Sequence, residues 1–161
     1  MTTGKTLPYV GEMLNVQHPS ALQVAQITVG CDTTFDINLL DTTGRNTDET
    51  YTLFTVPIDT FVMEVASAIT TAFTTNGSLQ IGDGDDSDGW LTDTAIQPST
   101  TNVAGKFTGT NEDTAAGYSG GKIYNAADTI DLYTEAGSAT IAAGDAIILL
   151  MYARAVGSDS D

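Results

Sequence analysis

Residues Val56–Trp90 read VPIDTFVMEVASAITTAFTTNGSLQIGDGDDSDGW, and this stretch decides which fold class the sequence favours. A long apolar, β-branched run ends at Asn76-Gly77, and a short alternating run, Ser78–Ile81, follows it. Asn-Gly between two such runs is the strongest short-range signal for a β-hairpin, because both central residues of a type I′ turn need positive φ. The stretch therefore predicts a hairpin near the middle of the chain, followed by an acidic loop that faces water.

Composition favours the same fold class for the rest of the chain. Its 161 residues are enough for one domain with a sizeable core. The chain holds 27 Thr, and it has 16 Asp against 5 Glu and only 5 Lys+Arg. Thr favours strands, whereas Glu and Lys are helix formers that this chain largely avoids. These counts predict an all-β protein.

The charge balance excludes several classes of partner. The net charge is −16, and only 5 cationic side chains are available for phosphate contacts. Nucleic acid and anionic membrane surfaces are therefore not expected as partners. Two explanations of the acidity are open, namely ordinary solubility and an acidic proteome in a salt-rich host.

The sequence also gives expectations about processing and compartment. No apolar stretch follows Lys5, so we expect no secretory signal, and the longest apolar run, Ala146–Ala153, is about a third of a membrane span. Cys31 is the single cysteine and cannot form an internal disulfide; we expect it to act as a small buried hydrophobe.

The chain divides into three expected segments. Residues 1–20 read as an extended N-terminal arm, residues 21–156 as a β-sandwich domain, and residues 157–161 as a solvated tail. The arm carries the run Leu7-Pro8-Tyr9-Val10, which is apolar enough to dock on the chain's own body or on a neighbour.

The domain segment predicts about eight strands at uneven spacing, which is typical of a two-sheet antiparallel β-sandwich, jelly-roll-like, with a long loop region from residue 83 to about 125. Short strands are expected inside that loop region. The expected strands are a run beginning at Ala21, then Phe35–Leu39, Tyr51–Val56, Ile58–Phe73, Ser78–Ile81, Ala104–Phe107, Gly121–Tyr124, Thr129–Tyr133 and Asp145–Ala155.

Three of these assignments leave alternatives. Pro57 separates Tyr51–Val56 from the next run, so the two are separate strands or one bent strand. Phe61–Ile69 also fits a short helix by pattern, but its β-branched flanks favour a strand. Ala146–Met151 is apolar on both faces, which indicates a central strand covered on both sides or covered on one side by a neighbouring subunit.

The acidic loop is the one candidate for a metal site. Asp83, Asp85, Asp86 and Asp88 supply the carboxylate oxygens that calcium prefers. An EF-hand register fails at both ends, because Gly84 then stands where the first Asp ligand belongs and Ala95 where the bidentate Glu belongs. A solvated loop is favoured, and calcium binding in another geometry stays open.

Catalytic and cofactor signatures are weak. The single histidine, His18, has no nucleophile or carboxylate placed near it by the sequence. Residues 116–123 resemble a P-loop only superficially, since Ala116 replaces its first Gly and Ile123 its Mg²⁺-binding hydroxyl; turn glycines are favoured. We predict no catalytic, cofactor or metal residue, and an enzyme is not expected.

Aromatic residues leave one further alternative. Trp90, Tyr118 and Tyr124 would suit the stacking platforms of a sugar-binding module. A role for Trp90 as a core or interface anchor is favoured over sugar stacking.

Part of the sequence resembles a known class of proteins. Val56-Pro57 leading to Phe61–Val65, then Thr71-Ala-Phe73 and Leu79–Asp85, is similar to small virion structural proteins of tailed bacteriophages or archaeal tailed viruses. Tyr124–Ile130, Ala143-Gly-Asp145 and the closing apolar strand extend the resemblance, which leaves residues 90–120 unmatched.

The resemblance implies a β-sandwich that assembles on a capsid or tail, commonly as a trimeric decoration (cement) protein. It implies a non-enzymatic role on the capsid exterior, with the major capsid protein as partner and a homotrimer as the assembled form. A tail or head-fibre component and the sugar-binding module are the alternatives.

Overall fold

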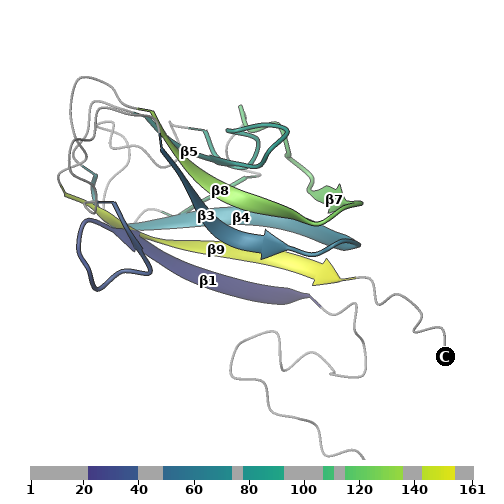
Figure 1. Ribbon diagram of the computed structural model, residues 1–161, viewed down its shortest axis with the longest axis horizontal. Helices are drawn as coiled ribbons and strands as arrows, with labels where there is room; N and C mark the ends of the chain where they lie inside the picture. The colour runs from purple at the N-terminus through teal and green to yellow at the C-terminus, as the bar shows by residue number, and fades with distance from the viewer. Residues whose placement is uncertain are drawn as a thin grey trace, which may run out of the picture.

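The computed structural model describes residues 22–39, 49–73, 78–92, 107–110, 115–135 and 143–154. Within these residues every regular element is a β-strand, and the strands form two sheets that face each other (Figure 1). The all-β two-sheet sandwich is therefore confirmed, whereas a jelly-roll connectivity stays a prediction. Phe61–Ile69 lies within a strand, so the helix alternative is wrong. No helix long and apolar enough to cross a membrane occurs among the described residues.

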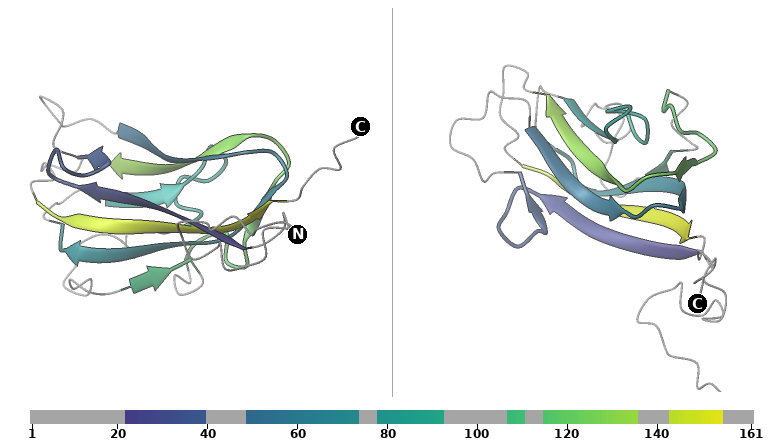
Figure 2. Two further views of the ribbon diagram at one scale, coloured as in Figure 1. Left: turned by 90° about the horizontal axis from the view of Figure 1, so that it is seen from below. Right: turned by 45° about the vertical axis from the view of Figure 1, so that its right-hand side comes forward.

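The larger sheet is built around the last strand of the chain. Its strand order is β2-β1-β9-β4-β6, and β7 pairs with β4 beside β6. Seen from below, β1, β9 and β4 run side by side across it (Figure 2). Its strands are β1 (Gln23–Gly30), β2 (Ile37–Asn38), β4 (Thr60–Thr71), β6 (Phe107–Gly109), β7 (Lys122–Tyr124) and β9 (Asp145–Arg154).

The smaller sheet has the order β3-β8-β5, with bounds Glu49–Val56 for β3, Asp128–Glu135 for β8 and Ser78–Gly82 for β5. All described strand pairs in both sheets are antiparallel, except that β2 runs parallel to β1. In Figure 1 the smaller sheet lies above the larger one.

The core lies between the sheets and follows the alternation of strand side chains. On β9, Ala146, Ile148 and Leu150 are buried, and the residues between them are half-buried on the outer face. β9 pairs with β1 on one side and β4 on the other, so its central position in the sheet is confirmed. One face of β9 is buried and the other is only half-buried, so coverage of both faces within this chain is not observed, and coverage by a neighbouring subunit stays a prediction. Ile130 and Leu132 of β8 meet this layer from the opposite sheet.

The break at Pro57 separates two strands that belong to different sheets. β3 ends at Val56 in the smaller sheet, and β4 begins at Thr60 in the larger one. Asp59 takes a φ of 61°, and its N–H donates to the carbonyl oxygen of Tyr124, 2.8 Å away. A left-handed residue in a short connection lets the chain cross between layers.

The predicted hairpin around Asn76-Gly77 is wrong. β4 and β5 lie in different sheets, because both edges of β4 are already occupied, by β9 on one side and by β6 and β7 on the other. β5 pairs with β8 instead, and Leu79 and Ile81 enter the core from the opposite sheet. Asn76 and Gly77 themselves lie outside the described residues.

The expected strand at Phe35–Leu39 is mostly a turn, and only Ile37–Asn38 pairs with a neighbour. The Asp36 carboxylate accepts from the Thr28 N–H at 2.8 Å, which bends the segment back on β1. The Phe35 ring packs so closely over Gly30 that a Cβ there would lie 2.5 Å from it. These contacts outweigh the alternating pattern.

Elsewhere the expected strands agree with the structure within a few residues. The short strands of the loop region appear as β6 and β7. The arm at 1–20, the tail at 157–161 and His18 lie outside the described residues.

Candidate functional site

The chemically richest cluster of the described residues is centred on Asp83, directly after β5. The chain folds back there, because the Asp83 N–H donates to the carbonyl oxygen of Asp86 at 2.9 Å. One carboxylate oxygen of Asp83 in turn accepts from the N–H groups of Asp85 and Asp86, at 3.0 and 3.2 Å. An Asp that bonds the backbone ahead of it is typical of a tight turn.

Three side chains from a distant segment close around this carboxylate. The Tyr118 hydroxyl donates to Asp83 at 2.9 Å, and the Tyr124 hydroxyl donates to it at 2.6 Å. The Lys122 ammonium lies 2.7 Å from the same carboxylate, whose side chain is 0% exposed. Asp83 is therefore a buried anion with a half-buried counterion, and a charge in a protein interior requires such a partner.

Lys122, which belongs to β7, connects this strand to the acidic loop after β5. Its ammonium also lies 2.9 Å from the Asp85 carboxylate and 3.1 Å from the Tyr118 hydroxyl. It stands 4.5 Å from the ring centre of Tyr118 and 5.0 Å from that of Tyr124. The lysine is thus held by two anions and two aromatic faces.

Trp90 packs beneath the cluster and contacts both of its tyrosines. Its indole N–H donates to the Tyr124 hydroxyl at 3.1 Å, and its ring meets Tyr118 edge-on with 5.0 Å between ring centres. Trp90 is 0% exposed and Tyr124 is 3% exposed. Trp90 is therefore a core anchor, and the proposal that these aromatics form an open sugar-stacking platform is wrong.

The electrostatics follow from burial and pairing. Burial raises the pKa of Asp83, but the hydrogen bonds from Lys122, Tyr124 and Tyr118 outweigh it, so that pKa lies below its ordinary value. Burial, together with the neighbouring Asp83, raises the pKa of Tyr118 to about 12 and that of Tyr124 further. Burial lowers the pKa of Lys122, but its bonds to Asp83 and Asp85 raise it overall. At neutral pH the cluster therefore holds the charged Asp83–Lys122 pair and neutral phenols.

The expectation of a water-facing acidic loop is wrong at its first residue. Asp83 is buried, whereas the Asp85 side chain is 79% exposed. Asp83 is buried by tertiary contacts. Lys122 and the two tyrosines that cover it come from a segment about 40 residues away in the chain.

The acidic residues that the structure brings together are not the same set as the candidate metal ligands in the sequence. Asp83, Asp85 and Asp128 each bring one carboxylate oxygen within 4.8 Å of the others, whereas Asp86 and Asp88 are not part of this group. Asp128, at the start of β8, was not a sequence candidate. Lys122 already supplies a positive charge between Asp83 and Asp85. The arrangement acts as an internal clamp on the loop.

The glycines of the superficial P-loop serve a turn. Gly120 and Gly121 take φ values of 101° and 92°, and the Gly121 N–H donates to the Tyr118 carbonyl oxygen at 2.9 Å. This turn lets Tyr118 and Lys122 meet the same carboxylate. The turn interpretation is confirmed.

A second feature is an apolar end of the sandwich, on the right in Figure 1 where β7 lies. Phe61 of β4 and Ile123 of β7 are cross-strand partners and are 36% and 62% exposed. Met63, two residues along β4, is 40% exposed, and Ile58 in the turn before β4 is 52% exposed. These four residues are called the apolar end below.

The described residues thus define a class of protein, a two-sheet β-sandwich with a clamped loop and an exposed apolar end. No protein family and no curated protein matches the chain. Among solved structures, a chain of the cyanophage Pam1 capsid asymmetric unit is similar, with 15% identity, a TM-score of 0.54, and coverage of 83% of this chain and 85% of that chain.

A chain of the acidic stable capsid of Helicobacter pylori bacteriophage KHP30 is also similar. It has 10% identity, a TM-score of 0.50, and coverage of 82% of this chain and 86% of that chain. At these identities the likeness establishes a shared fold.

Proposed function

We propose that this chain is a non-enzymatic virion structural protein that decorates the capsid and stabilises the shell by binding the major capsid protein. The observation that carries the proposal is the shared fold, which extends over more than four-fifths of this chain and of one chain in each of two phage capsid structures. The sequence resemblance to small virion proteins, which rests on strand and turn motifs from Val56 onward, points to the same class.

The apolar end supplies a surface for such binding. All of the large hydrophobic side chains that are exposed in the described residues belong to it. An exposed cluster of large apolar side chains gains free energy by burial against a partner. We assign this end to the contact with the shell.

Assembly as a homotrimer would allow stable binding to the shell even if each subunit's contact with it is weak. Once one subunit is bound, the second and third contacts form at high effective concentration on neighbouring capsid subunits. The clamped loop contributes rigidity, because Lys122 ties Asp83 and Asp85 to the β7 segment beside the apolar end.

The proposal is tested with shells of the virus that supplies this chain, purified without it. We expect the added chain to sediment with the shells, to saturate at a stoichiometric number of exterior sites, and to appear there by electron cryomicroscopy. Phe61→Asp and Ile123→Asp should each weaken binding by about tenfold or more, as loss of an interface anchor does.

Thr33→Asp is the matched control, because it adds the same charge in an exposed turn. This turn follows the last residue of β1, Gly30, and is away from the apolar end. Its binding should equal that of the native chain. Saturation at a single vertex or on a tail would favour the alternative of a tail or head-fibre component and contradict decoration. Equal binding by all variants would remove the apolar end from the interface.

A further inference from the structure

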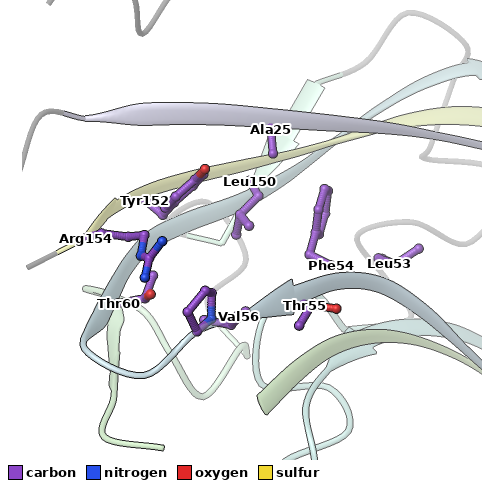
Figure 3. Close-up of a pocket in the computed structure, with 10 residues that line it drawn as sticks. Ala25, Leu53, Phe54, Thr55, Val56, Thr60, Leu150, Tyr152 and Arg154 are labelled. Carbon is purple, nitrogen blue, oxygen red and sulfur yellow. The ribbon is translucent and has the colours of Figure 1, made fainter. Parts of the chain in front are cut away.

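The two sheets leave a groove of about 300 Å³ between them, at the end where β1 begins and β9 finishes (Figure 3). Its walls are largely apolar and come from both sheets. Ala25, Leu150 and Tyr152 line it from the larger sheet, and Phe54 lines it from β3. Arg154 stands at the same end beside Thr60 (Figure 3).

One polar atom in this groove has no partner. Thr60 is 1% exposed, and its hydroxyl oxygen makes no hydrogen bond. A buried hydroxyl without a partner lowers the stability of the folded state. A hydroxyl of this kind lining an apolar groove indicates that a ligand with a hydrogen-bonding group belongs there.

The groove also runs along a sheet edge. β3 is the outer strand of the smaller sheet in the described part of the chain, and Phe54, Thr55 and Val56 of β3 all line the groove. The outer edge of a sheet can accept an added extended segment through main-chain hydrogen bonds, with side chains placed in neighbouring pockets. The occupant is therefore expected to be a peptide with apolar side chains.

The N-terminal segment of this chain meets these requirements. Leu22 is the first described residue, and the next residue, Gln23, pairs with Tyr152 of the groove wall. Leu7-Pro8-Tyr9-Val10 lies 12 residues ahead of Leu22 at its nearest residue. An extended connection of that length spans up to about 40 Å, so the segment can reach its own groove.

We propose that Leu7–Val10 occupies the groove of its own chain as a short extended segment beside β3. Its apolar side chains fill the space between Phe54 and Tyr152, and a main-chain group pairs with the Thr60 hydroxyl. The chain's own segment is the favoured occupant, because closing a short loop needs no second molecule. This inference does not depend on the capsid role.

Disulfide trapping tests the proposal in a Cys31→Ser background. Tyr9→Cys is combined with Ala25→Cys, whose side chain lines the groove. The matched control combines Tyr9→Cys with Gln26→Cys, because Gln26 is the next residue on β1 and is exposed. Under mild oxidation we expect an intramolecular disulfide in most of the Ala25 variant and in little of the control, detected by intact mass and non-reducing electrophoresis.

Three outcomes would overturn the proposal. Disulfide-linked dimers would assign the groove to the segment of a second copy. Equal trapping at both positions, or none at either, would leave Leu7–Val10 outside the groove.

A second measurement avoids engineered cysteines. Thr60→Val keeps the side-chain shape but removes the hydroxyl. We expect it to lower the Tm of the full chain, where the hydroxyl is paired with the N-terminal segment, and to leave the Tm of a chain lacking residues 2–15 unchanged or higher. The same change in both backgrounds would show that the hydroxyl does not contact the segment.

Discussion

At the scale of single residues, the pairing of Asp83 with Lys122 determines whether the loop after β5 stays closed. The ion pair is 2.7 Å long, and its carboxylate is fully buried. A buried pair contributes little against well-packed apolar residues, yet removing one partner is costly, because the other is left as an uncompensated charge. The pair holds this loop against a segment about 40 residues away in the chain.

Lys122→Met should destabilise the protein by about 3 kcal/mol or more, because Asp83 then loses its counterion in a buried site. Urea unfolding at neutral pH measures the change. The double variant Lys122→Met with Asp83→Asn should recover part of the loss. A single variant as stable as the native chain would show that Asp83 is solvated.

The lowered pKa of Asp83 predicts a specific acid sensitivity. A depressed folded-state pKa contributes stability that is present above the unfolded value of 3.8 and is lost as pH falls through the folded pKa. Asp83→Asn should therefore reduce stability at neutral pH and flatten its decline below about pH 4. Unfolding free energies measured from pH 7 to pH 2 compare the variant with the native chain.

The raised pKa of Tyr118 predicts a loss of stability at alkaline pH. A phenol whose pKa rises from 10.0 to about 12 contributes stability that is present below pH 10 and is lost as pH rises toward 12. Tyr118→Phe should be less stable at neutral pH but should lose less stability across that interval. Spectrophotometric titration at the phenolate band checks the pKa itself, and a Tyr118 titration near 10 would contradict the buried contact.

At the scale of elements, the fold depends on how closely the acidic loop returns onto its own strand. A Cβ at Gly82 would lie 2.0 Å from the carbonyl oxygen of Asp86, which is a backbone atom. A Cβ at Gly84 would find its nearest neighbour at 3.9 Å. The two glycines look alike in the sequence and differ only in this packing.

Gly82→Ala should cost about 1–3 kcal/mol or more, because the loop backbone must shift and the Asp83 turn must open. Gly84→Ala is the matched control and should change stability by less than about 0.5 kcal/mol. Thermal and urea unfolding measure both variants. Equal effects would mean that the loop does not pack on β5.

The strands also show which predictions local patterns support. β3 and β8 were predictable because apolar residues recur among polar ones along them, and β9 was predictable because its apolar residues run continuously. The pairing of β5 was not predictable, because Asn76-Gly77 indicates a turn but does not show which strand β5 pairs with after the turn. That choice depended on β4 having both edges occupied.

At the scale of the whole molecule, the net charge of −16 affects stability through repulsion across the surface. We expect the free energy of unfolding to rise as NaCl increases from 10 mM to 1 M, because the screening length falls from about 30 Å to about 3 Å. KCl should act alike if screening is the cause. A chain already fully stable at low salt would exclude the explanation based on a salt-rich host.

The sequence by itself determined the strand content and the central apolar strand, because composition and alternation are local properties of the chain. Tertiary structure alone decided the clamp, since no local pattern shows that Lys122 will meet Asp83 or that Asp128 will approach from β8. It also decided the groove, whose walls come from β1, β3 and β9. Contacts between residues far apart in the chain depend on which sheet each strand joins, and that is settled only when both layers pack together.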